Sequence, residues 1–338
     1  MATLSNTAMT LADWAKRTDP NGKAEKIAEL LGQKNEILTD MLFKEGNLPT
    51  GDQQPIRTGL PTAYYRMTNQ GVPSSKSTTA QITESTASLE ARSHVDQDIA
   101  ELNGNVASTR LSEADAFLEA MNQAQATTLV YGTSANPEEY VGFMSRYNDL
   151  SAPNAANILD AGGTGSDNTS ILLVGWGDNT IYGIFPKGSK AGLSHEDLGL
   201  DDVADSEGNL FRAYKDIWKW KNGLMVKDWR YGVRIANIDV SDLVGLTGTQ
   251  ATTASTSIIK MMSRAIDRMP MLTGIKPVFY VNRTVASHLR LIGLDKSSSA
   301  VTVEPALNQF GGSIFTTRFL GIPVRLVDTI TNAEARVV

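Results

Sequence analysis

Residues 110–132 have the sequence RLSEADAFLEAMNQAQATTLVYG, which predicts one long helix. Its apolar and small side chains recur near the 3.6-residue helical period, at Leu111, Ala114, Phe117, Leu118, Met121, Ala124, Thr128 and Leu129. Ser112 followed by Asp115 is a weaker form of the capping box, and Gly132 indicates the helix end. We therefore expect a helix over residues 111–131, and the rest of the fold is worked out from it.

The segment before this helix, residues 46–88, is poor in apolar side chains. After Gly46 it has the sequence NLPTGDQQPIRTGLPTAYYRMTNQGVPSSKSTTAQITESTAS, so the segment contains four prolines and four glycines. Such a segment buries too little apolar surface to offset the entropy lost on ordering it. Composition leaves two interpretations open: a flexible linker, or a β-ribbon arm of residues 62–67 and 78–86 that neighbouring subunits order.

The N-terminal residues predict helices. Pro20 suits a first helical turn, and apolar residues at helical spacing predict an amphipathic helix over residues 22–43. Residues 4–17 are expected to hold a shorter helix that begins near Thr10. This end of the chain is interpreted as an arm that lies outside the core.

The region after the long helix is rich in β-forming residues. SILLVGWGDNTIYGIFPKG (residues 170–188) contains two apolar runs separated by residues 177–179, which predicts a hairpin. FRAYKDIWKWKNGLMVKDWRYGVRIANI (residues 211–238) contains Asn222-Gly223, the dipeptide most typical of a two-residue hairpin turn. That turn would place four large side chains on one face, those of Trp218, Trp220, Met225 and Trp229.

The C-terminal third alternates helix and strand. Apolar residues between Ile258 and Met269 predict a helix that Pro270 ends. KPVFYVN (276–282) predicts a buried strand, TVASHLRLIG (284–293) a short helix, and SIFTTRF (313–319) and LGIPVRLVDTI (320–330) two further strands. The polar stretch TGTQATTAST (247–256) is interpreted as a boundary before this region.

The overall composition excludes several classes of protein. The 338 residues include 37 acidic and 31 basic side chains, which gives a net charge of -6. There is no long run of charges of either sign, and this argues against tight nucleic-acid binding, which needs clustered Lys and Arg. The absence of cysteine excludes disulfides and thiolate metal sites. The sequence has neither a secretory signal nor the roughly 20 consecutive apolar residues of a membrane-spanning helix. We expect a protein made in the cytoplasm that has no membrane partner.

Two glycine-containing stretches and one cluster of possible metal ligands fall short of known sites. GIFPKGSK (183–190) has Ser-Lys where a phosphate loop needs Lys followed by Ser or Thr, and AGGTGSDN (161–168) lacks the spacing of a dinucleotide-binding loop. His94, Asp96 and Asp98 would share one face of a strand, but a solvated polar surface explains them better than a metal site.

Catalytic residue sets are also missing from the sequence. It contains neither a Gly-x-Ser-x-Gly motif nor a cysteine nucleophile. His288 lies between apolar neighbours, which is typical of a packed or helix-surface histidine. The paired carboxylates Asp201-Asp202 and Glu138-Glu139 lie in polar contexts, where nothing would raise a carboxyl pKa for acid catalysis. We therefore predict a protein that is not an enzyme and has no catalytic, cofactor-binding or metal site.

Taken in order, these segments resemble the major capsid proteins of tailed bacteriophages, which have the Hong Kong 97 type capsid fold. The resemblance rests on MATLSNTAMTLADWAKRTDPNG (1–22), NLPTGDQQPIRTGLPTAYYRMTNQGVPSSKS (47–77), LSEADAFLEAMNQAQATTLVYGT (111–133), WGDNTIYGIFPKGSKAGL (176–193) and WKNGLMVKDWRYGVRIANID (220–239).

The resemblance implies an α+β fold with four parts: an N-terminal arm and helix (1–45), an extended loop (46–95), a peripheral domain with a spine helix (96–245), and an axial domain with the C-terminal strands (246–338). It implies that residues 46–88 form an inter-subunit arm. Some relatives crosslink a lysine of this loop to an asparagine. Lys76 lies in the corresponding segment, but nothing identifies its partner, and crosslinking is not inferred.

The resemblance also implies the partners. Copies of the chain would form hexamers and pentamers of an icosahedral head that encloses double-stranded DNA without sequence-specific binding. Because no long helical preface precedes the arm, a scaffolding protein would be a separate chain. A portal and a decoration protein are further expected partners, and the virion is the expected location. Two alternatives stay open: an encapsulin-like nanocompartment shell of the same fold, and an α/β enzyme built on the C-terminal third.

Overall fold

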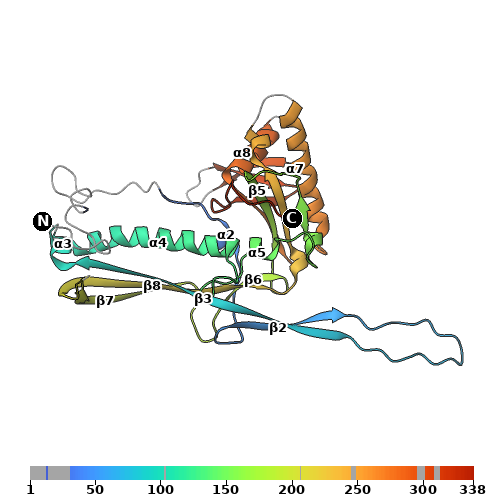
Figure 1. Ribbon diagram of the computed structural model, residues 1–338, viewed down its shortest axis with the longest axis horizontal. Coiled ribbons are helices and arrows are strands. Elements are labelled where there is room, and N and C mark those ends of the chain that lie inside the picture. The colour runs from blue at the N-terminus through green and yellow to red at the C-terminus, as the bar shows by residue number, and fades with distance from the viewer. Residues whose placement is uncertain are drawn as a thin grey trace.

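The computed structural model describes residues 13, 31–102, 104–205, 207–244, 249–294, 301–307 and 313–338. Figure 1 shows an elongated molecule in which helix α4 runs along two long strands, a ribbon projects far from one end, and an upright lobe carries α7 and α8. The strands of the described residues form one network in the order β11-β12-β13-β10-β5-β6-β8-β3-β2, with β1, β4, β7 and β9 attached beside it. The predicted α+β class is confirmed.

The predicted spine helix is helix α4 (Val106–Tyr131), which begins five residues before the predicted residue 111. The Asn105 side chain caps it by accepting a hydrogen bond from the Ser108 amide at 3.1 Å, so Ser112 lies inside the helix and does not cap it. The second half of α4 packs into the core through Met121, Leu129 and Val130. The short helix α3 (Gln97–Glu101) precedes it.

Two long strands lie under α4. β3 (Thr78–Asp96) pairs antiparallel with β8 (Leu210–Val226), from Thr86 opposite Gly223 to Asp96 opposite Ala213. The other side of β8 pairs with β7 (Leu193–Ala204), an edge strand with mostly exposed side chains. The β7–β8 pair is the hairpin of this region, and Asp205 and the positive-φ residue Gly208 lie in its turn.

The hairpin predicted at Asn222-Gly223 is wrong. Both residues lie inside β8, and neither adopts the positive φ of a type I′ turn. A Cβ added to Gly223 would lie 2.6 Å from the backbone oxygen of Ser85, so this glycine permits the close approach of β3 to β8. Successive strand residues face opposite sides; Trp218 therefore packs on Phe117 of α4, while Met225 joins a different cluster. The predicted single face of large side chains does not form, and Trp229 lies in the short helix η2 (Trp229–Tyr231).

The hairpin predicted around residues 177–179 is also wrong, although the chain does turn there. β5 (Asn168–Trp176) and β6 (Ile181–Phe185) touch at one parallel bridge, Trp176 to Ile181, and then diverge. β6 pairs with β8 and with β1 (Phe43–Glu45), whereas β5 pairs with β9 (Gly232–Asp239) and β10 (Lys276–Val281). The turn therefore carries the chain from one part of the network to another.

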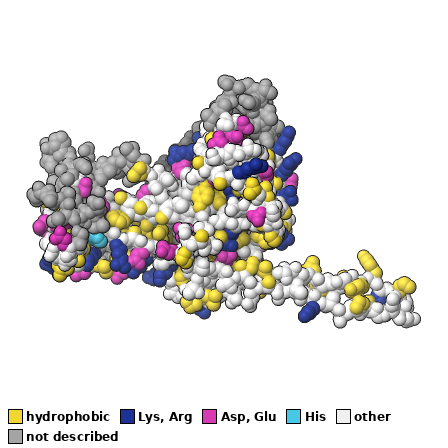
Figure 2. Space-filling view, viewed as in Figure 1, with side chains coloured by type: hydrophobic (Ala, Val, Ile, Leu, Met, Phe, Trp, Pro, Cys, Tyr) yellow, Lys and Arg dark blue, Asp and Glu magenta, His cyan; other side chains and the backbone are white. Residues whose placement is uncertain are grey.

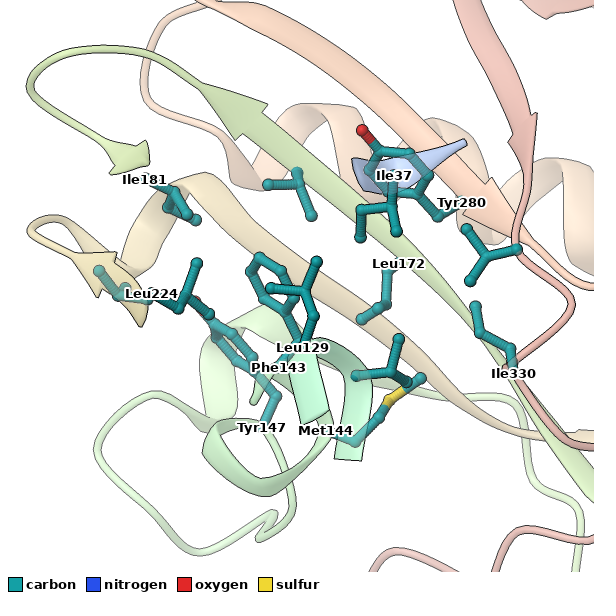
Figure 3. Packing of buried hydrophobic residues seen from close by; sticks show 14 of the residues in the cluster. Ile37, Leu129, Phe143, Met144, Tyr147, Leu172, Ile181, Leu224, Tyr280 and Ile330 are labelled. Atoms are coloured by element: carbon teal, nitrogen blue, oxygen red, sulfur yellow. The ribbon is translucent and has the colours of Figure 1, made fainter. Parts of the chain in front are cut away.

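The upright lobe has apolar cores on both faces of its central strands. Along β5, Leu172, Val174 and Trp176 enter one core, and Ile171 and Leu173 enter the other. Figure 3 shows the first core, in which Leu172 and Tyr280 meet Leu129 of α4 and Phe143 of α5 (Phe143–Arg146). Helices α7 (Thr249–Arg268) and α8 (Arg283–Leu294) cover the second core. Burial on both faces explains the nearly continuous apolar run of β5.

The C-terminal residues fasten this lobe to α4. Arg234 of β9 and Glu334 form a 2.8 Å ion pair whose side chains are 4% and 5% exposed. Tyr131 at the end of α4 donates a 2.7 Å hydrogen bond to the same carboxylate. Burial and the charge of Glu334 raise the pKa of Tyr131 to about 12. The C-terminal segment is therefore an integral part of the core.

Several predictions for the C-terminal third are confirmed. The predicted helices are α7 and α8, and the predicted strands are β10, β12 (Ser313–Phe319) and β13 (Ile322–Leu326). The polar stretch interpreted as a boundary, residues 247–256, is helical from Thr249 onward, where α7 begins; residues 247 and 248 lie outside the described residues. The remaining elements are β11 (Val301–Leu307), β4 (Ile158–Asp160), η1 (Ala155–Asn157) and α6 (Val240–Val244).

The helix predicted over residues 22–43 is wrong in its described half. Only α2 (Ile37–Asp40) is helical, and the chain is already extended at Phe43. Ile37 and Met41 are buried, so their apolar spacing reflects core contacts rather than a long helix. Residues 22–30 lie outside the described residues, as does the helix predicted in residues 4–17, apart from the helical Asp13. Among the described residues, no helix is both long and apolar enough to cross a membrane.

Candidate assembly surfaces

The most exposed part of the described chain is the tip of the ribbon arm. β2 (Gly51–Gly59) pairs with the first part of β3, and residues 60–77 join them beyond the last pair. Of these 18 joining residues, the 17 from 60 to 76 are exposed, and they form the projecting end of the ribbon (Figure 1). Their large apolar side chains have little or no cover: Leu60 is 80% exposed, Met67 72% and Tyr65 fully exposed, and Tyr64 and Val72 are about half exposed. Figure 2 shows these apolar side chains along the projecting arm.

The predicted arm exists, but one of its strands was misplaced. Residues 78–86 lie in β3 as predicted, whereas the partner strand is β2 and not residues 62–67. The predicted strand, with Tyr64 and Tyr65, instead lies in the irregular tip. The two sides of the tip meet where the Ser75 hydroxyl donates to the Thr62 carbonyl at 2.9 Å, but residues 62–67 pair with no described strand. β-forming side chains do not create a strand without such pairing.

The root of the arm, in contrast, is fixed to the body. Arg146 of α5 donates two parallel hydrogen bonds to Glu84 of β3, at 2.6 and 2.7 Å, and both side chains are largely buried. This fork geometry is the strongest form of a carboxylate–guanidinium pair. Ile82 packs on Tyr182, Ile184 and Met225 beside it.

On the β2 side of the root, a buried carboxylate holds the arm to the body. Asp52 of β2 is 2% exposed and accepts a 2.9 Å hydrogen bond from the Tyr182 hydroxyl. Burial and this contact raise the pKa of Tyr182, which therefore stays a donor. Charged and apolar contacts thus hold the root, so the tip projects from a defined base.

A second surface lies between α4 and the β7–β8 hairpin. Arg110 of α4 donates to Asp216 of β8 at 2.8 Å and to Asp197 of β7 at 2.6 Å, and these contacts raise its pKa. His195 contacts the same Asp216 carboxylate at 2.8 Å and stacks on Trp218. An open groove of about 460 Å³ runs above this cluster; Leu111, Leu118 and Leu193 line its apolar part.

The structure separates the residues considered as metal ligands. Asp96 accepts a hydrogen bond from the Asp98 amide at 2.8 Å and so caps α3, while His94 lies earlier on β3. In the part of the chain that the structure describes, no three His, Asp or Glu side chains are placed to hold a metal ion. Asp96 therefore has a capping role.

The other residues considered are dispersed. His288 is a packed histidine, 3% exposed, and burial lowers its pKa. Asp201 pairs with Lys215 at 2.8 Å, and Glu138 is exposed in a loop. Residues 183–190 lead from β6 into a turn where the Gly188 amide donates to Glu45 at 2.8 Å. Residues 161–168 form a loop that the Asn168 side chain closes onto the Gly165 oxygen. No described contact brings these groups together.

Sequence reasoning missed the contacts that matter most here. Arg146 and Glu84 are 62 residues apart, and Arg110 and Asp216 are 106 apart. No local pattern relates residues at such distances. One signal was available: a charged residue within an otherwise apolar helix turn, as at Arg146 between Met144 and Tyr147, usually has a buried partner.

Comparison with known proteins gives the family. The family model described as "Major capsid protein GP7" matches residues 19–338, nearly the whole chain. The chain belongs to this family. It is therefore a phage major capsid protein, a structural component of the virion, and its fold is of the Hong Kong 97 type. The resemblance seen in the sequence is confirmed.

One solved structure supports this assignment. The chain is similar to a protein in the structure of bacteriophage Epsilon15, with 32% identity, a TM-score of 0.74, and coverage of 100% of this chain and 99% of that one. It also matches the capsid of bacteriophage JBD30 at 10% identity, with a TM-score of 0.49 and coverage of 89% and 92%. No curated protein sequence matches. The family assignment favours the phage capsid over the nanocompartment shell and the α/β enzyme.

Proposed function

We propose that this capsid protein assembles with copies of itself into hexamers and pentamers of an icosahedral head enclosing double-stranded DNA, and that it catalyses no reaction. The observation that carries the proposal is the arm, in which a fixed root supports a tip with five exposed large apolar residues. Exposed apolar clusters on a soluble chain indicate a contact surface.

The position of the tip favours contact with another subunit. It projects beyond the last strand pair, away from the chain's own apolar cores (Figure 1). A projecting element that meets a different surface on the next copy makes a heterologous contact, and repeated contacts of this kind form a ring when the rotation between copies closes. Hexamers and pentamers are such rings.

We infer four parts within the subunit: an N-terminal arm (1–45), the extended loop (46–95), a peripheral domain around α4 (96–245) and an axial domain (246–338). β5 and β9 belong to the third range by sequence, but they share a core with α7 and α8. In space, these two strands would belong to the axial domain.

The remaining partners are inferred from the family. A separate scaffolding protein and a portal would act during assembly in the host cytoplasm, and a decoration protein is a possible later partner. The head would hold DNA without reading its sequence.

Particle formation tests the proposal. The chain is expressed alone and together with a scaffolding protein, and the product is measured by size-exclusion chromatography with light scattering and by electron microscopy. We expect capsomers and closed particles in the megadalton range. A small closed oligomer under both conditions would contradict the proposal.

A further inference from the structure

Basic residues are concentrated in one segment of this acidic chain. Residues 249–294 contain a single acid, Asp267, and six Lys or Arg residues, whereas the whole chain has a net charge of -6. The six are Lys260, Arg264, Arg268, Lys276, Arg283 and Arg290. The total charge of the chain therefore does not reveal this local excess of basic residues.

Two of the six cations form ion pairs with described acids, whereas the other four form none in the part of the chain that the structure describes; Arg290 donates a 3.2 Å hydrogen bond to the Ala286 carbonyl of its own helix. Lys276 pairs with Asp40 at 2.6 Å and Arg283 with Asp328 at 2.7 Å. The other four are exposed, and none of them forms an ion pair with another described residue; they are Lys260, Arg264, Arg268 and Arg290. We call these four side chains the basic face.

The helices direct the basic face away from the core. On α7, Ile258, Met262 and Met269 are buried against the sheet, and the cations at positions 260, 264 and 268 follow an i, i+4, i+8 pattern on the outer side. Four residues advance a helix by about 6 Å, so the three charges form a row along α7. Figure 2 shows Lys and Arg side chains along the edge of the lobe where α7 runs in Figure 1.

On α8, Val285, Leu289 and Ile292 are buried in the same core, and Arg290 is exposed. α7 and α8 contact each other, so Arg290 adds a fourth cation to the outer side of a two-helix layer. The basic face therefore spans both helices.

The basic face does not stabilise the subunit itself. Like charges at i and i+4 of a helix destabilise it by about 0.2–0.5 kcal/mol, and α7 has two such pairs, 260 with 264 and 264 with 268. Asp267 is the one acid on α7 that can offset them. An external anionic partner would explain the arrangement better than helix stability does.

We propose that the basic face binds the phosphate backbone of duplex DNA, so that the α7–α8 layer faces the genome; this rests on the proposed function. A row of cations suits a polyanion with regularly spaced charges, and binding would release counterions. α7 and α8 contain no Phe, Tyr or Trp, so they offer no platform on which unpaired bases could stack. Phosphate contacts fix position without reading sequence.

Salt-dependent DNA binding tests this inference. Binding of purified subunit to a 20-base-pair duplex is measured by fluorescence anisotropy over a series of salt concentrations. The test variant is Lys260→Gln, Arg264→Gln, Arg268→Gln. The control is Lys187→Gln, Lys219→Gln, Lys221→Gln, which removes the same charge from three lysines outside α7 and α8 that form no ion pair with another described residue.

Each phosphate neutralised contributes about 0.9 to the slope of log affinity against log salt, so the test variant should lose about 2.7 from its slope. The control should keep the wild-type slope. Equal slopes for the wild type and the test variant, an equal loss in the control, or no binding by the wild type would overturn the inference.

Shell assembly without DNA separates this inference from the proposed function. We expect the test variant to form particles as the wild type does. If only the test variant fails to assemble, the basic face is a protein–protein contact and the DNA inference is wrong. If the wild type also forms no particles, the proposed function fails, whatever the DNA measurement gives.

Discussion

The arm tip and strand β5 obtain order in opposite ways. All nine residues of β5 are buried, with apolar cores on both faces, whereas all residues from 60 to 76 are exposed. β5 is stabilised by contacts within its own chain, and its neighbours are fixed when the subunit folds. The large apolar side chains of the tip are not buried by the described part of the chain, so their contacts would form during assembly. The chain therefore has two groups of residues: folding residues, which are buried within the subunit, and assembly residues, which would be buried only between subunits.

The largest effect is expected beside β5, at the buried ion pair. Arg234→Ala would leave Glu334 buried without its cation, which should lower the free energy of unfolding by about 3–5 kcal/mol. Urea unfolding measures this. Arg230→Ala is the control: its pair with Asp228 is half exposed and should contribute about 0–1 kcal/mol. Equal losses in the two variants would show that burial does not distinguish these pairs.

The next effect is expected where the root of the arm meets the body. Gly223→Val would force β3 away from β8, because an added Cβ meets the Ser85 backbone oxygen, and should cost about 1–3 kcal/mol. We also expect few closed particles, because the root of the arm would shift. Gly71→Val in the tip is the control for urea unfolding, since a Cβ there meets nothing within 4 Å. Wild-type stability of Gly223→Val would contradict the close-approach explanation.

The two glycines also show what the sequence could and could not predict. Asn222-Gly223 has the composition of a turn, but only the position of β3 shows that the glycine serves strand packing. Helix α8 and strand β10 were predicted to within one residue at each end, because their apolar patterns are regular and turn residues lie beside them. For α4 the predicted C-terminal end was correct, but the start was predicted five residues too late. The tip was predicted as a strand because Tyr64 and Tyr65 favour strands, but strand formation depends on a partner that local sequence does not specify.

The candidate surfaces were less predictable than the fold. Low apolar content identified the arm segment, and the family resemblance favoured an inter-subunit role. The root contacts were not predicted, because Arg146 and Glu84 meet only after β3 and α5 have packed. The segment that carries the basic face has six cations in 46 residues, but this excess was missed because charge was considered over the whole chain. Only the helical spacing and the exposure of these cations show that they lie together on one outer face.

A smaller effect is expected in the core, where the buried His288 should make the free energy of unfolding depend on pH. Burial lowers the pKa of His288 in α8, so the folded state resists protonation more than the unfolded state does. Stability from this group is then complete above the unfolded pKa of about 6.5 and decreases as pH falls below it. Urea unfolding at several pH values should show a smaller decrease for His288→Gln than for the wild type. Identical pH profiles would remove His288 as a cause of acid sensitivity.

The smallest effect on stability is expected at the arm tip, where the effect on assembly should be greatest. Tyr64→Ser with Tyr65→Ser removes two rings that the chain itself leaves half or fully exposed, so the free energy of unfolding should change by no more than about 0.5 kcal/mol. The same variant should form far fewer closed particles, because the rings would be buried against a neighbouring subunit.

The control for this variant is Leu210→Ser with Met271→Ser, which removes two apolar side chains that are 70% and 58% exposed elsewhere on the subunit. It should leave both stability and particle yield unchanged. If both double variants assemble normally, the tip contributes nothing to the shell and its exposed apolar residues need another explanation. If both fail equally, assembly depends on general surface hydrophobicity. Only loss of particles from a stable tip variant, with normal particles from the control, supports the separation of folding residues from assembly residues.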